Sequence, residues 1–275
     1  MNGSKRFNGT RHFVYAHWPL FAGLYGCMVF ALLVIGISAM QGWLSFIPMA
    51  TAVLLISGFF LLTTVWSAYQ LYDYGGVQPH HVLFDMGHIQ ATDTFVYIDL
   101  GYRRRAISLS RRLTTGRIVV LDIYNPQWMT SQALVRLRRR MLIPKPDPRL
   151  SFRDASMDLM PLPDKSVPVV ILCQIASELW QRGDQITLLK EIHRVLTPNG
   201  RLLMAERTRT QTNWMVMGPL ALSLKRQEDW QKLLQTAGFV VRRTQDLAGV
   251  ISCFRADKPS PAEARQMAFE LTFNK

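Results

Sequence analysis

Three aspartates stand where short apolar runs of this 275-residue chain end. Asp99 lies at the end of the run 95–100, Asp122 closes 117–122, and Asp154 follows 150–152. In an open parallel sheet, ligands bind beyond the carboxyl ends of the strands, and an acidic residue about 20 positions after a glycine turn is placed to bind a ribose diol. A single aspartate at a strand end caps a helix as often as it binds a ligand. The ordered set, with Gly101 after the first strand and residues 173–178 after the fourth, predicts a nucleotide-like ligand at one edge of a sheet.

The segments that would position these residues alternate between strand-like and helix-like patterns. Strands are expected at 95–100, 117–122, 150–152, 167–173, 201–205, 239–244 and 249–256, and helices at 81–89, 106–113, 127–141, 185–196 and 228–238. Such alternation predicts βαβ units and a parallel sheet. The short turn 245–248 forces the last two strands to pair antiparallel. We therefore expect an α/β fold, a Rossmann-like doubly wound sheet that is mostly parallel and closed by a C-terminal antiparallel hairpin.

From about residue 83 to residue 256, the chain resembles the class I S-adenosylmethionine-dependent methyltransferases, especially the branch that acts on quinones, sterols and small lipids. Residues 95–101 (Phe-Val-Tyr-Ile-Asp-Leu-Gly) are similar to the first motif, and 119–126 (Val-Val-Leu-Asp-Ile-Tyr-Asn-Pro) to the ribose-binding second motif. Residues 153–155 resemble the Gly-Asp-Ala element whose carboxylate meets the adenine, and 161–164 the Pro-Phe-Pro-Asp turn. The helix-turn-strand stretch 188–203, with its Arg-Val-Leu and Pro-Asn-Gly, is the closest match.

The resemblance implies methyl transfer from S-adenosylmethionine, and its motifs give a set of candidate site residues. The implied cofactor-binding residues are Asp99, Gly101, Asp122, Asp154, Ala155 and Cys173. On the acceptor side we expect Trp214 and Met217, because the weakly charged segment 208–225 follows the fifth strand and would cover the acceptor; the alternative is a helix that simply packs on the sheet. We also expect Ser177 there, because it stands where the family often has polar residues after the fourth strand. Displacement at a sulfonium needs positioning and charge, with a base only if the acceptor loses a proton. Glu178 is the candidate base, or else a carboxylate at a helix start. No metal site is expected.

The first motif departs from the family pattern D-x-G-x-G-x-G. Arg103 and Arg105 stand at its later glycines, where glycine would permit positive φ and a close approach to the cofactor. This departure supports an alternative, a catalytically inactive relative that uses the arginine turn to bind an anion or serves as a scaffold subunit at the membrane. A nicotinamide-dependent reductase is a third interpretation, because arginines there would hold a 2′-phosphate. That fold lacks the terminal antiparallel hairpin.

Two uncharged apolar runs, 20–40 and 44–66, precede this domain. A membrane span needs about 20 apolar residues, and both runs meet that length. Helices in a soluble core rarely stay uncharged all round for so long. A cleaved signal peptide is also disfavoured, because the first run is longer than its usual apolar region and a second run follows at once. The sequence therefore predicts a transmembrane helical hairpin.

The charge distribution predicts the orientation of this hairpin. The formal net charge is +13, and Lys5, Arg6 and Arg11 precede the first run, whereas the tip 41–43 carries no lysine or arginine. The positive-inside rule then places both termini and the catalytic domain in the cytoplasm, at the cell membrane. A further basic group should complement a helix dipole and meet anionic headgroups; it comprises Arg136, Arg138, Arg139, Arg140 and Lys145. Nucleic acid is not an expected partner, since no aromatic platform or known nucleic-acid-binding motif accompanies these residues.

Together these patterns divide the chain into five parts. They are a cytoplasmic segment at 1–17, two transmembrane helices within 18–66, a linker and entry helix at 67–94, a methyltransferase-like domain at 95–258 and a tail at 259–275. The expected function is methylation of a hydrophobic or lipid-borne acceptor, whose local concentration the hairpin would raise by holding the domain at the bilayer.

Overall fold

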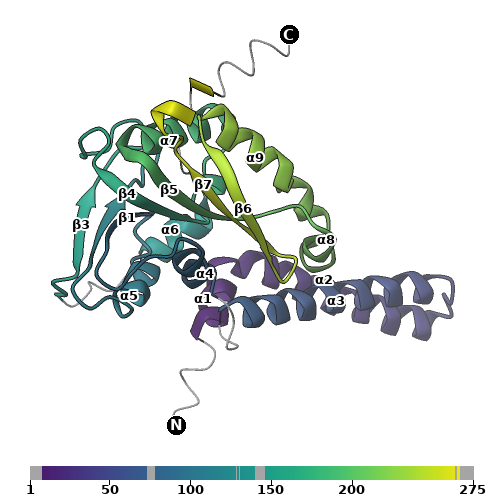
Figure 1. The fold of residues 1–275 in the computed structure, drawn as a ribbon. Helices are drawn as coiled ribbons and strands as arrows, with labels where there is room; N and C mark the ends of the chain where they lie inside the picture. The colour runs from purple at the N-terminus through teal and green to yellow at the C-terminus, as the bar shows by residue number, and fades with distance from the viewer. Residues whose placement is uncertain are drawn as a thin grey trace.

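A seven-stranded sheet forms the centre of the computed structural model, which describes residues 8–72, 78–127, 129, 131–139, 146–263 and 265–266. The strand order is β3-β2-β1-β4-β5-β7-β6 (Figure 1). Neighbours from β3 to β5 pair parallel, whereas β7 is antiparallel to both β5 and β6. The expected fold class is therefore confirmed. The strands are β1 Thr94–Asp99, β2 Arg117–Asp122, β3 Leu150–Asp154, β4 Val167–Cys173, β5 Leu196–Arg207, β6 Val240–Leu247 and β7 Ile251–Asp257.

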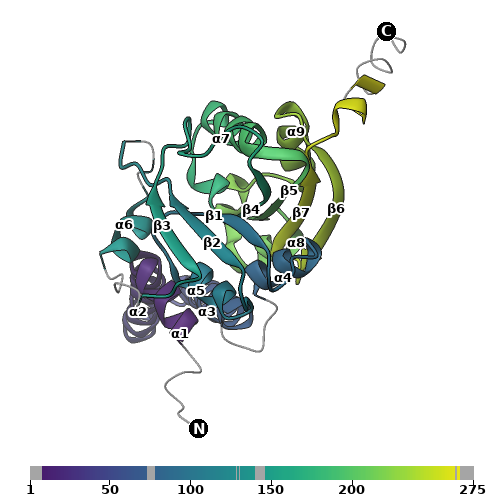
Figure 2. The same ribbon diagram turned by 60° about the vertical axis from the view of Figure 1, so that its left-hand side comes forward.

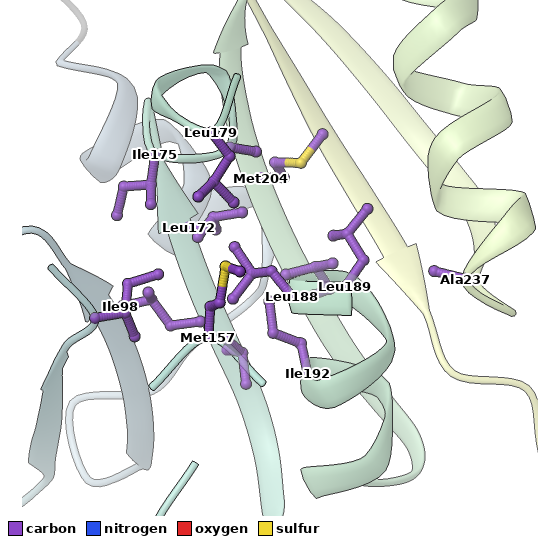
Figure 3. Close-up of a cluster of buried hydrophobic side chains, with 14 of the residues drawn as sticks. Ile98, Met157, Leu172, Ile175, Leu179, Leu188, Leu189, Ile192, Met204 and Ala237 are labelled. Atoms are coloured by element: carbon purple, nitrogen blue, oxygen red, sulfur yellow. The ribbon is translucent and has the colours of Figure 1, made fainter. Parts of the chain in front are cut away.

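Helices cover both faces of this sheet. In Figure 2, α4 (Pro79–Met86) and α5 (Arg104–Ser110) lie on one side, and α7 (Arg182–Val195) and α9 (Gln227–Thr236) lie on the other. Central strands such as β4 are nearly continuous apolar runs because neither face meets water. Figure 3 shows Leu188, Leu189 and Ile192 of α7 beside Ile98 and Leu172 of the sheet. This double cover leaves the strand ends as the place where ligands can approach.

Two long apolar helices, α2 (Trp18–Gln41) and α3 (Phe46–Tyr72), form a hairpin that projects from the sheet domain (Figure 1). Both are long and apolar enough to cross a membrane, and only 6% and 11% of their most apolar windows are buried within the protein. Helices in the core of a soluble domain would be mostly buried instead. Helix α3 extends to Tyr72, six residues beyond the end of the predicted run.

The hairpin packs on the segment that follows β5. This segment consists of α8 (Gln211–Met217) and the 3-10 helix η3 (Gly218–Ser223). The Thr64 hydroxyl of α3 donates to the Val216 carbonyl of α8 at 2.8 Å. Gly218 has φ +57°, and a Cβ there would lie 2.8 Å from Phe60 Cζ. The chain therefore passes close to α3 at this point.

Several elements differ from the sequence-based expectation. Residues 1–17 contain an unpredicted helix, α1 (Asn8–Ala16), and β5 is longer than the expected strand 201–205. Helix α6 (Gln132–Arg138) is shorter than the helix expected at 127–141, in the part of that range that the structure describes. Some residues named in the sequence analysis lie outside the described residues. They are Lys5, Arg6, Arg140 and Lys145, residues 73–77 of the linker, and residues 264 and 267–275 of the tail.

Candidate active site

The strand register brings the three aspartates together. Asp99 on β1 pairs with Asp122 on β2, which in turn pairs with Asp154 on β3. All three end their strands, so they stand abreast at the carboxyl edge of the sheet. This is the edge at which an open parallel sheet binds its ligands.

Asp99 holds the turn that follows β1. Its carboxylate is buried and accepts a hydrogen bond from the Arg103 backbone N–H at 2.6 Å. Burial raises the pKa of Asp99, while the backbone N–H groups of Arg103 and Leu100 oppose this shift. Gly101 has φ +81° and Arg103 has φ +51°. Two of the three motif positions, Gly101 and Arg103, thus have positive φ, whereas Arg105 lies in helix α5 (Arg104–Ser110). A non-glycine residue in such a sparsely populated region costs about 1–3 kcal/mol.

Arg138 lies on the carboxylate of Asp122. Its Nη1 donates to both oxygens of that carboxylate, at 2.9 and 3.0 Å, and to the Leu100 carbonyl at 2.6 Å. The guanidinium also lies over the Tyr124 ring, 4.0 Å from its centroid. A Cβ on Gly101 would lie only 2.1 Å from the same Nη1. The space above Gly101 is therefore filled by a side chain from α6.

A second guanidinium reaches the end of β4. Arg105 donates to the Cys173 carbonyl and to the Gln174 side-chain oxygen. The Cys173 thiol itself is buried, and burial raises its pKa. Cys173 accordingly contributes its backbone carbonyl to this edge of the sheet, and the carbonyl is engaged by Arg105.

An open cavity of about 540 Å³ lies between the ends of β2 and β3. Tyr124 and Asn125 line one side, and Asp154 and Ala155 line the other. The Ala155 N–H donates to the Asp122 carbonyl at 2.9 Å, and the Tyr124 N–H donates to the Asp122 side chain at 3.1 Å. These bonds fix the two cavity-lining loops relative to Asp122, which itself is not among the lining residues.

Two glutamates lie beyond the ends of β4 and β5. Burial raises the pKa of Glu178, against a hydrogen bond from Ser131 and the charges of Arg105 and Arg207. Glu206 is fully buried and accepts hydrogen bonds from the Ile175 and Ala176 N–H groups at 2.9 and 2.8 Å. Burial raises the pKa of Glu206 to about 7, while a hydrogen bond with Ser177 acts in the opposite direction. Sequence reasoning missed Glu206, although an acidic residue at the end of a fifth apolar strand is a usable signal.

A second cavity, of about 390 Å³, lies beside the end of β5. Its walls combine the apolar hairpin, α1 and α8, and they include Phe13, His17, Phe60, Thr64, Arg207 and Met217. Met217, expected on the acceptor side, lines this cavity. Trp214 is 42% exposed and is not among the lining residues, and Ser177 is exposed at η2 (Ala176–Glu178).

The candidate residues thus fall into two neighbouring groups. Asp99, Gly101, Asp122, Asp154 and Ala155 surround the ends of β1, β2 and β3. Met217 belongs to the cavity at the end of β5, and Glu178 lies within the electrostatic reach of both Arg105 and Arg207. Within the described part of the chain, no group of three or more histidines, cysteines or carboxylates is arranged to hold a metal ion.

Comparisons with known proteins agree with this geometry. Residues 100–204 match a family described as methyltransferase domain. A protein from Mycolicibacterium smegmatis named probable S-adenosylmethionine-dependent methyltransferase is 33% identical over 100 residues, which make up 35% of this chain. That match spans 38% of the relative's own length.

Solved structures share the fold. A SAM dependent methyltransferase from Aquifex aeolicus superimposes with a TM-score of 0.50 at 18% identity, over 66% of this chain and 89% of the other. The pyocyanin biosynthetic protein PhzM superimposes with a TM-score of 0.50 at 16% identity, over 78% of this chain and 58% of the other. At such identities the likeness concerns the fold alone.

S-adenosylmethionine, which the name of the Mycolicibacterium smegmatis relative gives as its cofactor, is chemically compatible with the polar groups at the edge formed by β1, β2 and β3. The 540 Å³ cavity has room for an adenine between Tyr124 and Ala155, and the Asp122 carboxylate is placed to accept from a ribose diol. Arg138 holds that carboxylate and fills the space over Gly101, so its side chain would have to move for a ribose to bind there. The sheet topology is thus that of the Aquifex aeolicus structure, and residues 100–204 are similar to the methyltransferase domain family and to the Mycolicibacterium smegmatis relative.

Proposed function

We propose that this protein is a membrane-anchored methyltransferase whose acceptor is hydrophobic or carried by a lipid. The observation that carries the proposal is the 390 Å³ cavity, because its walls come both from the apolar helices α2 and α3 and from α8 at the end of β5. Apolar pockets of this size with a few polar groups are typical binding sites for small molecules. An acceptor in the cavity would contact the hairpin and the methyltransferase domain together.

The chain's own residues would hold and orient the two reactants. Asp122 would bind the ribose, Tyr124 and Ala155 would enclose the adenine, and the turn at Gly101 would face the amino-acid part. The bound cofactor supplies an activated methyl group with a neutral leaving group, so positioning and electrostatics account for most of the catalysis. Glu178, between the charges of Arg105 and Arg207, remains a candidate base near the reacting groups.

The anchoring part of the proposal rests on α2 and α3. Their apolar length supports two spans, and the charges that flank them favour both termini and the sheet domain in the cytoplasm. With a net charge of +13, the sheet domain would also be attracted to anionic headgroups, at about 1 kcal/mol per lysine or arginine near the surface.

Labelled-cofactor binding and methylation of membrane lipids would test the proposal. The full chain, purified in nanodiscs, is incubated with S-adenosylmethionine labelled in its methyl group and a total lipid extract. We expect saturable cofactor binding and label in the organic phase, and both should weaken strongly in Asp122→Ala. Saturable binding with label only in the aqueous phase would refute a lipid acceptor, and absence of binding to a folded protein would refute the enzyme.

A second candidate function, a non-catalytic scaffold, is favoured by Arg105 and Arg138. Their guanidinium groups occupy the Cys173 carbonyl and the Asp122 carboxylate, and in an inactive relative they would stay there. In that case Asp122→Ala would leave the biological function intact, while replacement of Arg103, Arg104 and Arg105 would abolish it. The methyltransferase proposal predicts that Asp122→Ala abolishes the function.

A further inference from the structure

The cavity at the end of β5 has one positively charged wall among apolar ones. Arg207, the last residue of β5, places its guanidinium 5.6 Å from the Phe13 ring centroid, and its Nη1 lies 3.7 Å from Met217 Sδ. Phe13 and Met217 both line the cavity, so the charge of Arg207 lies at its wall. Most of the other walls are apolar side chains of α2, α3 and α8.

His17 lines the same cavity in a defined tautomer. Its Nδ1 lies 3.0 Å from the Phe13 carbonyl oxygen, which can only accept a hydrogen bond, so Nδ1 carries the proton. The neutral ring then keeps a lone pair on Nε2. Burial lowers the pKa of His17, and the charges of Arg207 and Arg136 lower it further, against the Phe13 carbonyl. His17 is thereby held as a neutral proton acceptor close to Arg207.

A permanent cation beside a neutral imidazole complements one kind of ligand group. A hydroxyl that loses its proton needs an acceptor for that proton and a positive charge for the oxygen that remains. A quaternary ammonium group would be repelled by Arg207, and a purely aliphatic ligand would offer no proton to His17. The charged neighbours of this region include Arg136 on α6 and Glu178 on η2, and Glu178 lies within the influence of Arg207.

We propose that the cavity binds the acceptor and selects an amphiphile with an apolar chain and an acidic hydroxyl, which becomes methylated on oxygen. The inference rests on the proposed function, and it assigns the base to His17 in place of Glu178. The O–H bond breaks and its proton goes to His17 Nε2, while Arg207 stabilises the oxygen. That oxygen forms the bond to the methyl carbon as the carbon–sulfur bond of S-adenosylmethionine breaks, and the electron pair stays on sulfur. The apolar chain lies along α2 and α3.

The probe for this proposal is 4-dodecyl-2-nitrophenol, whose phenolate absorbs visible light. The full chain is studied in phosphatidylcholine nanodiscs, with empty nanodiscs as the blank. We expect the titration midpoint of the bound probe to fall by about one pH unit or more, because Arg207 favours the phenolate. Arg207→Gln should remove this shift and Arg207→Lys should restore it. Arg243→Gln, which changes an exposed arginine on β6, should titrate as the wild type does.

The preference of the cavity for a phenol over its methyl ether tests the role of His17 separately from that of Arg207. Unsubstituted 4-dodecylphenol should displace the probe at least about tenfold better than its methyl ether, which has no proton to donate, and His17→Phe should abolish this preference. His17→Gln, whose side chain can still accept a hydrogen bond, should keep part of it. Calorimetric binding of S-adenosylhomocysteine, measured in every variant, reports the fold and the cofactor site independently. A probe that does not bind, an unshifted midpoint, or equal binding of the methyl ether would overturn the inference even where the cofactor binds normally.

Discussion

At the scale of single residues, Arg138 occupies the Asp122 carboxylate, at which the proposed function places the ribose of the cofactor. The ion pair is partly buried, with side-chain exposures of 29% and 17%, and such pairs contribute about 1 kcal/mol when solvent still reaches them. Arg138→Ala frees the carboxylate and the space above Gly101. We therefore expect this variant to bind S-adenosylhomocysteine about fivefold more tightly, which corresponds to about 1 kcal/mol. Titration calorimetry measures the affinity, with Arg139→Ala, an exposed neighbour, as the matched control. A weaker affinity of Arg138→Ala would show that the guanidinium moves onto the cofactor instead of away from it.

Glu206 makes the stability of the fold depend on pH. Its pKa is raised to about 7 in the folded protein, above the value of about 4.3 expected for an unfolded chain. The folded state then holds this proton at pH values where the unfolded state has lost it. Stability contributed by the protonated carboxyl is fully present below about pH 4 and is lost as the pH rises through 7.

Glu206→Gln should remove this dependence, because glutamine can accept the same two backbone hydrogen bonds without a charge. Between pH 5 and pH 8, we expect the wild type to lose about 2–3 kcal/mol of unfolding free energy relative to the variant. Urea unfolding at several pH values measures the difference. Glu228→Gln, at an exposed position of α9, serves as the control and should follow the wild type. Parallel curves for Glu206→Gln and the wild type would contradict the raised pKa.

At the scale of elements, the contact between α3 and the α8–η3 segment depends on Gly218. Its φ of +57° and ψ of −138° belong to a region that only glycine adopts readily, and a Cβ there would clash with the Phe60 ring. Gly218→Ala should lower stability by about 2 kcal/mol or more through strain and overpacking. Thermal unfolding in nanodiscs measures the loss.

A double-mutant cycle separates the two causes. Phe60→Ala removes the ring that the new Cβ would meet, so it should relieve the steric part of the Gly218→Ala defect and leave the backbone part. Gly183→Ala is the matched control, because a Cβ at that position would meet nothing within 4 Å and the φ of Gly183 is not in the positive range. Additive effects of Phe60→Ala and Gly218→Ala on the unfolding free energy would show that the two positions are not energetically coupled.

The central sheet was predictable from the sequence because its strands carry their own signals. Apolar β-branched runs such as 167–173 predict buried parallel strands, and the short turn before β7 predicts an antiparallel edge. Because parallel strands end at the same edge, this arrangement places Asp99, Asp122 and Asp154 side by side. Helices α1 and α6 carry weaker signals. Helix α1 is only nine residues long, so its apolar face does not stand out beside the long apolar runs that follow. Helix α6 contains Arg136 and Arg138, so its sequence reads as an exposed basic cluster and its ends are hard to predict.

The contacts that were missed depend on side chains that meet across long stretches of sequence. Arg138 reaches Asp122 and Leu100 from a helix after β2, and His17 comes near Arg207 from before the first apolar helix. No periodicity or local motif encodes such meetings, because they follow from how α1 and α6 pack. The positive φ of Arg103 was equally hidden, since its residue type argues against that conformation.

At the scale of the whole molecule, cysteine labelling can test the proposed orientation of the hairpin and the sheet domain in the membrane. If α2 and α3 span the membrane with both termini in the cytoplasm, the tip between them faces outward and the C-terminal part of the chain faces inward. The native Cys173 and Cys253 are buried in the sheet, and Cys27 lies on α2, where lipid would surround it. An impermeant maleimide should therefore leave the native thiols of intact cells unlabelled, which gives a clean background for single introduced cysteines.

Gln41→Cys, at the end of α2, should react with the impermeant maleimide in intact cells, whereas Ser260→Cys, just after β7, should react only after permeabilisation. The two variants control for each other, because each places one cysteine at or just beyond the end of an element and the predicted sides of the membrane are opposite. The reverse pattern would place the methyltransferase domain outside the cell, where S-adenosylmethionine would not reach it from the cytoplasm. Labelling of both positions in intact cells would rule out the two-span arrangement. A ligand would then have to reach the 390 Å³ cavity from solution, because its α2 and α3 walls would no longer lie in a bilayer.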